Sequence, residues 1–141
     1  MKFAREAIAS ILRRFRKPEL PWNLRFGAEG ERAAERFVRK RLGYSVIARN
    51  FRTTRGELDL VAIDGKVVVV IEVKTRRSGD PLLAVTHAKQ RRVGIAARQF
   101  ARKRKLRDHP MRFDVITVLW PEGEREPLIE HIRHAFTLDE R

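Results

Sequence analysis

The chain has 141 residues, the length of one ordinary domain with a sizeable core. Its 43% hydrophobic and 35% charged residues predict a folded protein. No run of about 18 apolar residues occurs, which excludes an ordinary transmembrane helix. Cysteine is absent, so disulfides, thiolate nucleophiles and cysteine zinc sites are excluded, in agreement with a reducing, cytoplasmic location.

The charge balance points to a polyanionic partner. The 32 Lys and Arg residues outnumber the 18 Asp and Glu residues and leave a formal charge of +14. Such a surplus attracts polyanions, and nucleic acid is the commonest soluble one. A ribosome-associated protein, an anionic membrane surface and a basic proteome are the alternatives.

Residues 1–24 differ in pattern from the rest and are expected to form a basic amphipathic extension. Apolar residues from Phe3 to Phe15 recur at helical spacing among Lys and Arg, and Pro18 and Pro21 end the pattern. An uninterrupted apolar segment is missing, so we expect no secretory signal. Three roles stay open: a helix on an anionic membrane, a basic arm on nucleic acid, or a helix docked on its own domain.

Residues 25–141 predict a single α/β domain with a mixed sheet. Apolar spacing indicates a helix over residues 28–41, and Gly43 is suited to end it. The further elements expected in chain order are strands over residues 44–50, 57–63 and 66–74, a helix over roughly 82–106, a strand over 111–120 and a strand or mixed element over 128–136.

The second and third predicted strands are joined by Asp64-Gly65, a strong signal for a two-residue hairpin turn. With these two residues in the loop, Ile63 faces Lys66. Extending this register places Asp59 opposite Val70 and makes it a diagonal neighbour of Glu72, roughly 7–8 Å away between backbones.

Side chains alternate along strands, so Asp59, Glu72 and Lys74 are expected on one face of the hairpin, at its open end. Leu58 and Leu60 are expected together on the opposite, apolar face. In the same register Glu57 lies directly opposite Glu72. Either a bulge at the preceding glycine turns the Glu57 side chain away, or Glu57 is a further ligand of a shared metal.

Converging carboxylates repel one another and lose hydration, so a positive group is needed to offset that cost. Lys74 supplies one charge and a divalent cation is the other candidate; oxygen ligands without Cys favour Mg²⁺ or Mn²⁺. The alternative is that Asp59, Glu72 and Lys74 form a salt-bridge cluster that only keeps a strand end hydrated.

These residues also carry a resemblance. Asp59, followed beyond the hairpin by Glu72-Val73-Lys74, resembles the Asp…Glu-x-Lys signature of the PD-(D/E)XK nuclease superfamily. The segment Gly27-x-x-Gly-Glu31 resembles the acidic helix of archaeal Holliday junction resolvases. The combined order of further segments resembles the small bacterial YraN family (UPF0102); these segments are residues 49–52, 56–60, 70–76, 112–115 and 131–136.

The resemblance implies a restriction-endonuclease-like mixed β-sheet flanked by helices. It implies that Asp59 and Glu72 hold Mg²⁺ or Mn²⁺, that Lys74 orients the attacking water, and that Glu31 completes the acidic cluster as a further metal ligand. Leu58 stands where the superfamily name has its proline, a departure that is frequent among nucleases of this type.

The implied activity is metal-dependent hydrolysis of phosphodiester bonds in nucleic acid, with structured or branched DNA favoured. Junction resolvases act as symmetric dimers because two cuts are needed, which leaves a homodimer open, although no sequence feature establishes one. The alternative is a non-catalytic nucleic-acid-binding or scaffold protein that keeps the nuclease fold.

Residues 81–107 contain no acidic residue and nine Lys or Arg, which predicts a helix with a basic outer face that follows a phosphate backbone. The predicted nucleic-acid-binding residues are Arg76, Arg77, Lys89, Arg91, Arg98 and Arg102. Lys89 falls on the apolar stripe, so its ammonium either reaches the acidic cluster or extends along the packed surface. His131 and His134 are interpreted as ordinary strand or surface residues.

Overall fold

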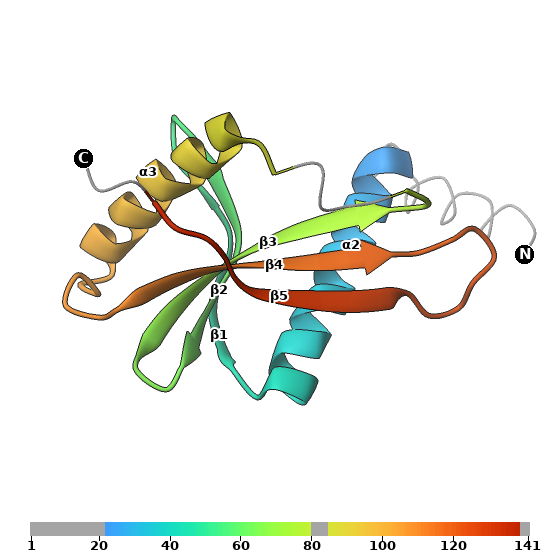
Figure 1. Cartoon of the computed structure of the whole chain (residues 1–141), viewed down its shortest axis with the longest axis horizontal. Coiled ribbons are helices and arrows are strands. Elements are labelled where there is room, and N and C mark those ends of the chain that lie inside the picture. The colour runs from blue at the N-terminus through green and yellow to red at the C-terminus, as the bar shows by residue number, and fades with distance from the viewer. Residues whose placement is uncertain (1–21, 80–84, 139–141) are drawn as a thin grey trace, which may run out of the picture.

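The computed structural model describes residues 22–79 and 85–138, in which five strands form one sheet in the order β1-β2-β3-β4-β5 (Figure 1). The β3–β4 pair is parallel and the other neighbours are antiparallel, so the sheet is mixed. The elements are α2 (Trp22–Phe37), η1 (Val38–Leu42), β1 (Ser45–Arg52), β2 (Glu57–Asp64), β3 (Val67–Arg76), α3 (His87–Lys103), β4 (Met111–Leu119) and β5 (Leu128–Phe136).

Helix α2 and the π-helical segment η1 form the first helical unit. The unit ends at Gly43, which has a left-handed φ of 71°, as its position after the apolar pattern predicts. Because α2 begins at Trp22, it runs across the predicted boundary between residues 24 and 25. The roles considered for the extension depend mainly on residues 1–21, which lie outside the described residues.

The predicted register of the β2–β3 hairpin is wrong by two residues. The turn consists of Gly65 and Lys66, and Asp64 pairs with Val67. Only Gly65 of these two turn residues has a positive φ, the pattern of a turn with glycine at its first central position. Asp64 is the last residue of β2, and its carboxylate accepts a hydrogen bond from Arg112, 3.2 Å away.

The shift by two residues preserves which residues share a face, because side chains alternate with a period of two. It also changes the residue that lies opposite Asp59. Leu60 pairs with Ile71, and one further step along this register places Asp59 across from Glu72. Glu57 does not face Glu72 and pairs with Arg52 of β1, with 3.7 Å between the charged groups.

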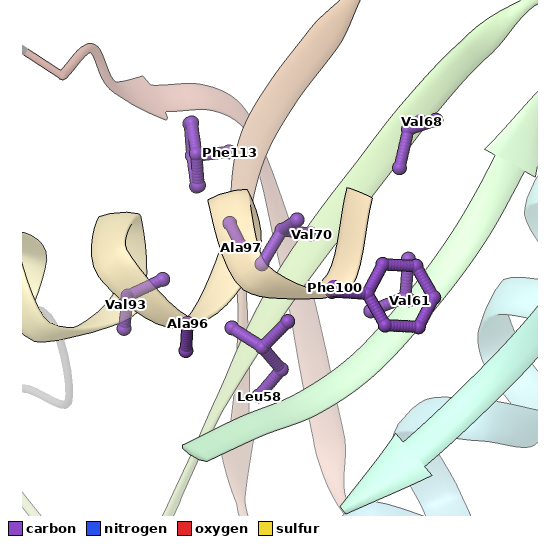
Figure 2. Close-up of a cluster of buried hydrophobic side chains, with 9 residues drawn as sticks. All are labelled: Leu58, Val61, Val68, Val70, Val93, Ala96, Ala97, Phe100 and Phe113. Atoms are coloured by element: carbon purple, nitrogen blue, oxygen red, sulfur yellow. The ribbon is translucent and has the colours of Figure 1, made fainter. Parts of the chain in front are cut away.

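Helix α3 covers one face of the sheet. Its apolar stripe, which includes Val93, Ala97 and Phe100, packs on Val61 and Val70 (Figure 2). Leu58 belongs to the same cluster, so the expectation that it shares a face with Leu60 is wrong; strict alternation is lost where β2 extends past its last pair with β3.

Helix α2 covers the other face, where Ala34 and Val38 pack against Leu60 and Ile71. Figure 1 shows α2 and α3 on different sides of the sheet. The central strand β3 is thereby buried on both faces, as its continuous valine run predicts.

Helix α3 is shorter than the predicted span of roughly 82–106. It begins after Thr86, whose hydroxyl accepts a hydrogen bond from the backbone N–H of Lys89 at 3.2 Å. The first residues of the predicted span, 82–84, lie outside the described residues.

The predicted single α/β domain with a mixed sheet flanked by helices is confirmed, and the architecture is consistent with a restriction-endonuclease-like fold. Within residues 22–79 and 85–138, no helix combines the length and apolar character needed to cross a membrane.

Candidate active site at the open end of the hairpin

The acidic residues of β2 and β3 meet where these two strands part. Beyond the Leu60–Ile71 pair, the backbone N–H of Val73 donates to the Asp59 carboxylate at 2.9 Å. A side chain therefore takes the place of a main-chain acceptor at this point. The exchange ties Asp59 to the strand that carries Glu72 and Lys74.

Glu72 is almost fully buried, with 1% of its surface exposed. Its Oε2 lies 3.4 Å from the Nζ of Lys89, while Oε1 is buried and has no hydrogen-bond partner. Burial, followed by the charge of Asp59, raises the pKa of Glu72 to about 8. An unpaired buried carboxylate oxygen is costly, and here it is a coordination position available to a cation.

Two lysines face this carboxylate pair. Burial, followed by the neighbouring Lys89 ammonium, lowers the pKa of Lys74 to about 8. Burial opposes the charge on Lys89, but contact with Lys74 and the charges of Glu72 and Asp59 leave its pKa above the ordinary value. The ammonium of Lys89 therefore reaches the acidic cluster, which decides between the two orientations left open by its place on the apolar stripe.

Glu31 approaches from the opposite face, carried by α2. A Cβ at the preceding Gly30 would lie 1.9 Å from Oγ1 of Thr75, so glycine is required for α2 to pack this closely on β3. Burial, followed by the charges of Asp59 and Glu57, raises the pKa of Glu31 to about 7. The carboxyl of Glu31 is thus within electrostatic range of Asp59.

Two cavities flank the end of β3. One, of about 380 Å³, is lined by Asp59, Glu72 and Lys89 together with residues of the β1–β2 turn and α3. The other, of about 410 Å³, is lined by Glu31 and Lys74 together with the first turns of α2 and the segment that ends β3. Glu72 thus lines the first cavity and Glu31 the second.

The carboxylates at this site provide some, but not all, of the oxygen ligands that a small hard cation needs. In the parts of the chain that the structure describes, no three His, Cys, Asp or Glu side chains are grouped closely enough to hold a metal ion. Asp59 and Glu72 are a pair, with the free Oε1 of Glu72, and Glu31 does not join them in a three-ligand group. Mg²⁺ is commonly bound by one or two carboxylates with water in its remaining positions, which this pair fits.

Lys89 contacts Glu72, and the other five predicted nucleic-acid-binding residues occupy two surfaces. Arg76 and Arg77 line the Glu31 cavity, where the Arg77 guanidinium lies 4.1 Å from the centroid of the Phe26 ring and donates to the carbonyl of Trp120 at 3.3 Å. Exposed arginines on α3 form the second surface; they are Arg91, Arg98 and Arg102.

A buried ionic network that links β2, β4 and β5 was missed by the sequence interpretation. Arg112 donates to the fully buried Asp114 at 2.8 and 3.1 Å and also binds Asp64 and Tyr44. His131 is a strand residue of β5, as predicted, and lies 2.7 Å from Asp114.

Burial raises the pKa of Asp114, but the hydrogen bonds from Arg112, His134 and His131 outweigh this effect and hold it below the ordinary value. Only the backbone N–H of His134 takes part, at 2.9 Å, and its side chain is exposed as expected. The available sequence signal was an Arg-x-Asp pair on one face of a strand that is otherwise apolar.

Comparison of the sequence with known proteins identifies the family of this chain. Residues 30–118 match the family model described as "Uncharacterised protein family UPF0102". The chain is 44% identical over 119 residues to a UPF0102 protein of Geotalea daltonii, covering 82% of this chain and 92% of that protein.

A UPF0102 protein of Geobacter sulfurreducens is 47% identical over 117 residues, covering 79% of this chain and 88% of the relative. One of Rhodococcus opacus is 42% identical over 117 residues, covering 81% and 98%. The matched residues include both strands of the acidic pair, helix α3 and the part of α2 that carries Glu31. The chain therefore belongs to the UPF0102 family.

Proposed function

We propose that this protein is a metal-dependent nuclease of the PD-(D/E)XK type that hydrolyses phosphodiester bonds in nucleic acid, with structured or branched DNA as the favoured substrate. The observation that carries the proposal is the buried Glu72 beside the half-buried Asp59, with an unpartnered Glu72 oxygen and two lysines against it. A surface salt-bridge cluster does not require a carboxylate with 1% exposure.

Asp59 and Glu72 would hold the cation, and Glu31 completes the acidic set from the neighbouring cavity. Mg²⁺ or Mn²⁺ bound there supplies Lewis-acid activation of water and neutralises charge on the phosphoryl group. The chain's net charge of +14 supports a polyanionic substrate around this acidic centre.

Lys74 orients the attacking water and stabilises developing negative charge. Its pKa of about 8 lets Nζ hold or release a proton near neutral pH, as a general acid–base group requires. Lys89 keeps its proton and lies against the Glu72 carboxylate, where its charge favours the ionised form of Glu72.

A second candidate function is a non-catalytic nucleic-acid-binding or scaffold protein. One observation favours it: Lys89 already neutralises Glu72, and the described residues include no group of three metal ligands. Both functions predict binding to nucleic acid, so binding does not distinguish them.

The test is a cleavage panel of labelled four-way junction, flap, single strand, duplex and structured RNA, each with Mg²⁺, Mn²⁺ or EDTA. We expect wild-type cutting that needs metal, its loss in Glu72→Gln, and a rate about 10²–10³-fold lower in Lys74→Met, the range for losing one preorganised stabilising group. Glu130→Gln, at an exposed position of β5, is the matched control and should cut normally. Tight wild-type binding without cutting in either metal would favour the scaffold function.

A further inference from the structure

Two arginines outside the predicted set line the cavity that holds Asp59 and Glu72. Arg55 belongs to the β1–β2 turn and Arg92 to α3, and both side chains are exposed. Within residues 22–79 and 85–138, neither forms a salt bridge with a carboxylate. Both guanidinium groups are therefore available to an anion that enters this cavity.

The turn that carries Arg55 is held by its own hydrogen bonds. The Thr53 hydroxyl accepts from the backbone N–H groups of Arg55 and Gly56, at 3.2 and 3.0 Å, and donates to the Gly56 carbonyl at 2.9 Å. The backbone N–H of Thr53 donates to the same carbonyl at 2.8 Å. These bonds fix the backbone from which the Arg55 side chain extends.

The same turn is packed directly against α3. A Cβ at Gly56 would lie 2.7 Å from the backbone carbonyl oxygen of Arg92, a distance that side chains do not tolerate. Glycine therefore permits the turn to touch the helix backbone. This contact sets the positions of Arg55 and Arg92 relative to each other and to the carboxylate pair.

The carboxylates of Glu57, Asp59 and Glu72 line this cavity and repel an anionic backbone unless cations line the same space. Guanidinium groups suit this task because their planar donors match phosphate oxygens. On the basis of the proposed nuclease function, we propose that Arg55 and Arg92 form a phosphate-binding subsite that holds the nucleic-acid strand beside Asp59 and Glu72. Arg91 and Arg98 line a separate cavity with Thr137 and Leu138, so they contribute to a different surface.

The test measures binding in EDTA, where no cutting interferes, with fluorescently labelled junction, flap, single-stranded and duplex DNA at several salt concentrations. Arg55→Gln/Arg92→Gln is compared with Arg107→Gln/Arg133→Gln, which removes the same charge from exposed positions outside this cavity. Each phosphate contact contributes about 0.9 to the slope of log affinity against log salt, so we expect the first double variant to lower the slope by roughly 2.

We also expect Arg55→Gln/Arg92→Gln to weaken DNA binding about tenfold or more. The control double variant should change the salt slope by less than half as much as Arg55→Gln/Arg92→Gln does. Equal effects of the two pairs would overturn the subsite. Thermal unfolding checks that both double variants fold, and a Mg²⁺ cleavage assay runs in parallel. If the wild-type protein binds DNA but never cuts it, the nuclease function is contradicted and the subsite result remains valid. If the wild-type protein cuts DNA but the two double variants change the salt slope equally, only the subsite is contradicted.

Discussion

Glu72 combines two features that are seldom found together, near-complete burial and an oxygen without a hydrogen-bond partner. Burial and the Asp59 charge favour its protonated form, whereas Lys89 favours the ionised form. The balance leaves a group whose protonation changes near neutral pH. Such groups concentrate at functional sites, because structural stability alone does not require them.

The raised pKa of Glu72 makes stability depend on pH in the absence of divalent metal. Its folded pKa of about 8 exceeds the ordinary 4.5, so the folded protein binds more protons than the unfolded chain between these values. This contribution to stability is full below about pH 4.5 and is lost as pH rises towards 8. We expect the urea midpoint of Glu72→Gln, measured in EDTA between pH 5 and 8, to fall less steeply than that of wild type.

Part of the slope should persist in the variant, because the pKa of Glu31 is raised to about 7 and acts with the same sign. The lowered pKa of Lys74 acts mainly above pH 8, outside this window. Glu130→Gln changes a carboxylate that is exposed and should reproduce the wild-type slope. Parallel curves for wild type and Glu72→Gln would contradict the assignment of the titration to Glu72.

At the scale of elements, the site depends on how closely the two helices approach the sheet. Gly30 lets α2 touch Thr75 on β3, and Gly56 lets the β1–β2 turn touch α3. Each contact lies next to a residue with a role in the proposed chemistry, Glu31 in the first case and Arg55 in the second. Neither contact is visible in apolar periodicity, because glycine adds no apolar side chain.

Gly30 and Gly27 provide a matched pair of substitutions in the same helix. A Cβ at Gly30 would overlap Thr75, so we expect Gly30→Ala to lower the free energy of unfolding by about 1–3 kcal/mol, as overpacking does. A Cβ at Gly27 meets nothing within 4 Å, so Gly27→Ala should be neutral or stabilise by about 0.5–1 kcal/mol through helix propensity. Urea unfolding measures both, and equal effects would contradict the close α2–β3 contact.

At the scale of the whole molecule, positive charge surrounds a small acidic centre. The exposed arginines of α3 extend this charge away from the cavity that holds Asp59 and Glu72. Phosphate contacts made by such a surface add affinity without reading bases, and their contribution weakens with salt. The sign and position of these charges therefore matter more than their exact geometry.

Reversing two of the α3 charges tests whether this helix lies along nucleic acid. Arg98→Glu/Arg102→Glu should flatten the salt dependence of DNA binding, with a slope smaller by about 2 if each arginine contacts one phosphate. Arg125→Glu/Arg133→Glu changes the net charge equally, at exposed positions of the β4–β5 connection and β5. An unchanged slope in the α3 variant, or an equal change in both, would show that α3 is not the contact surface.

The order of helices and strands could be predicted from local patterns, because the spacing of apolar residues and the position of turn residues depend only on residues close together in the sequence. The β2 and β3 strands and Gly43 are examples. The same patterns brought Asp59 and Glu72 to one open strand end, and a register error of two residues left their shared face unchanged.

The sequence by itself therefore determined the fold class, the strand order along the chain and the neighbourhood of the acidic pair. Tertiary structure decided the contact between Asp64 at the hairpin turn and Arg112, which comes from a strand far along the chain. It also decided the salt bridge of Lys89 to Glu72, and the placement of Glu31 in a separate cavity. These features arise from long-range ion pairs and close backbone contacts, whose partners are far apart in the chain and leave no periodic signal.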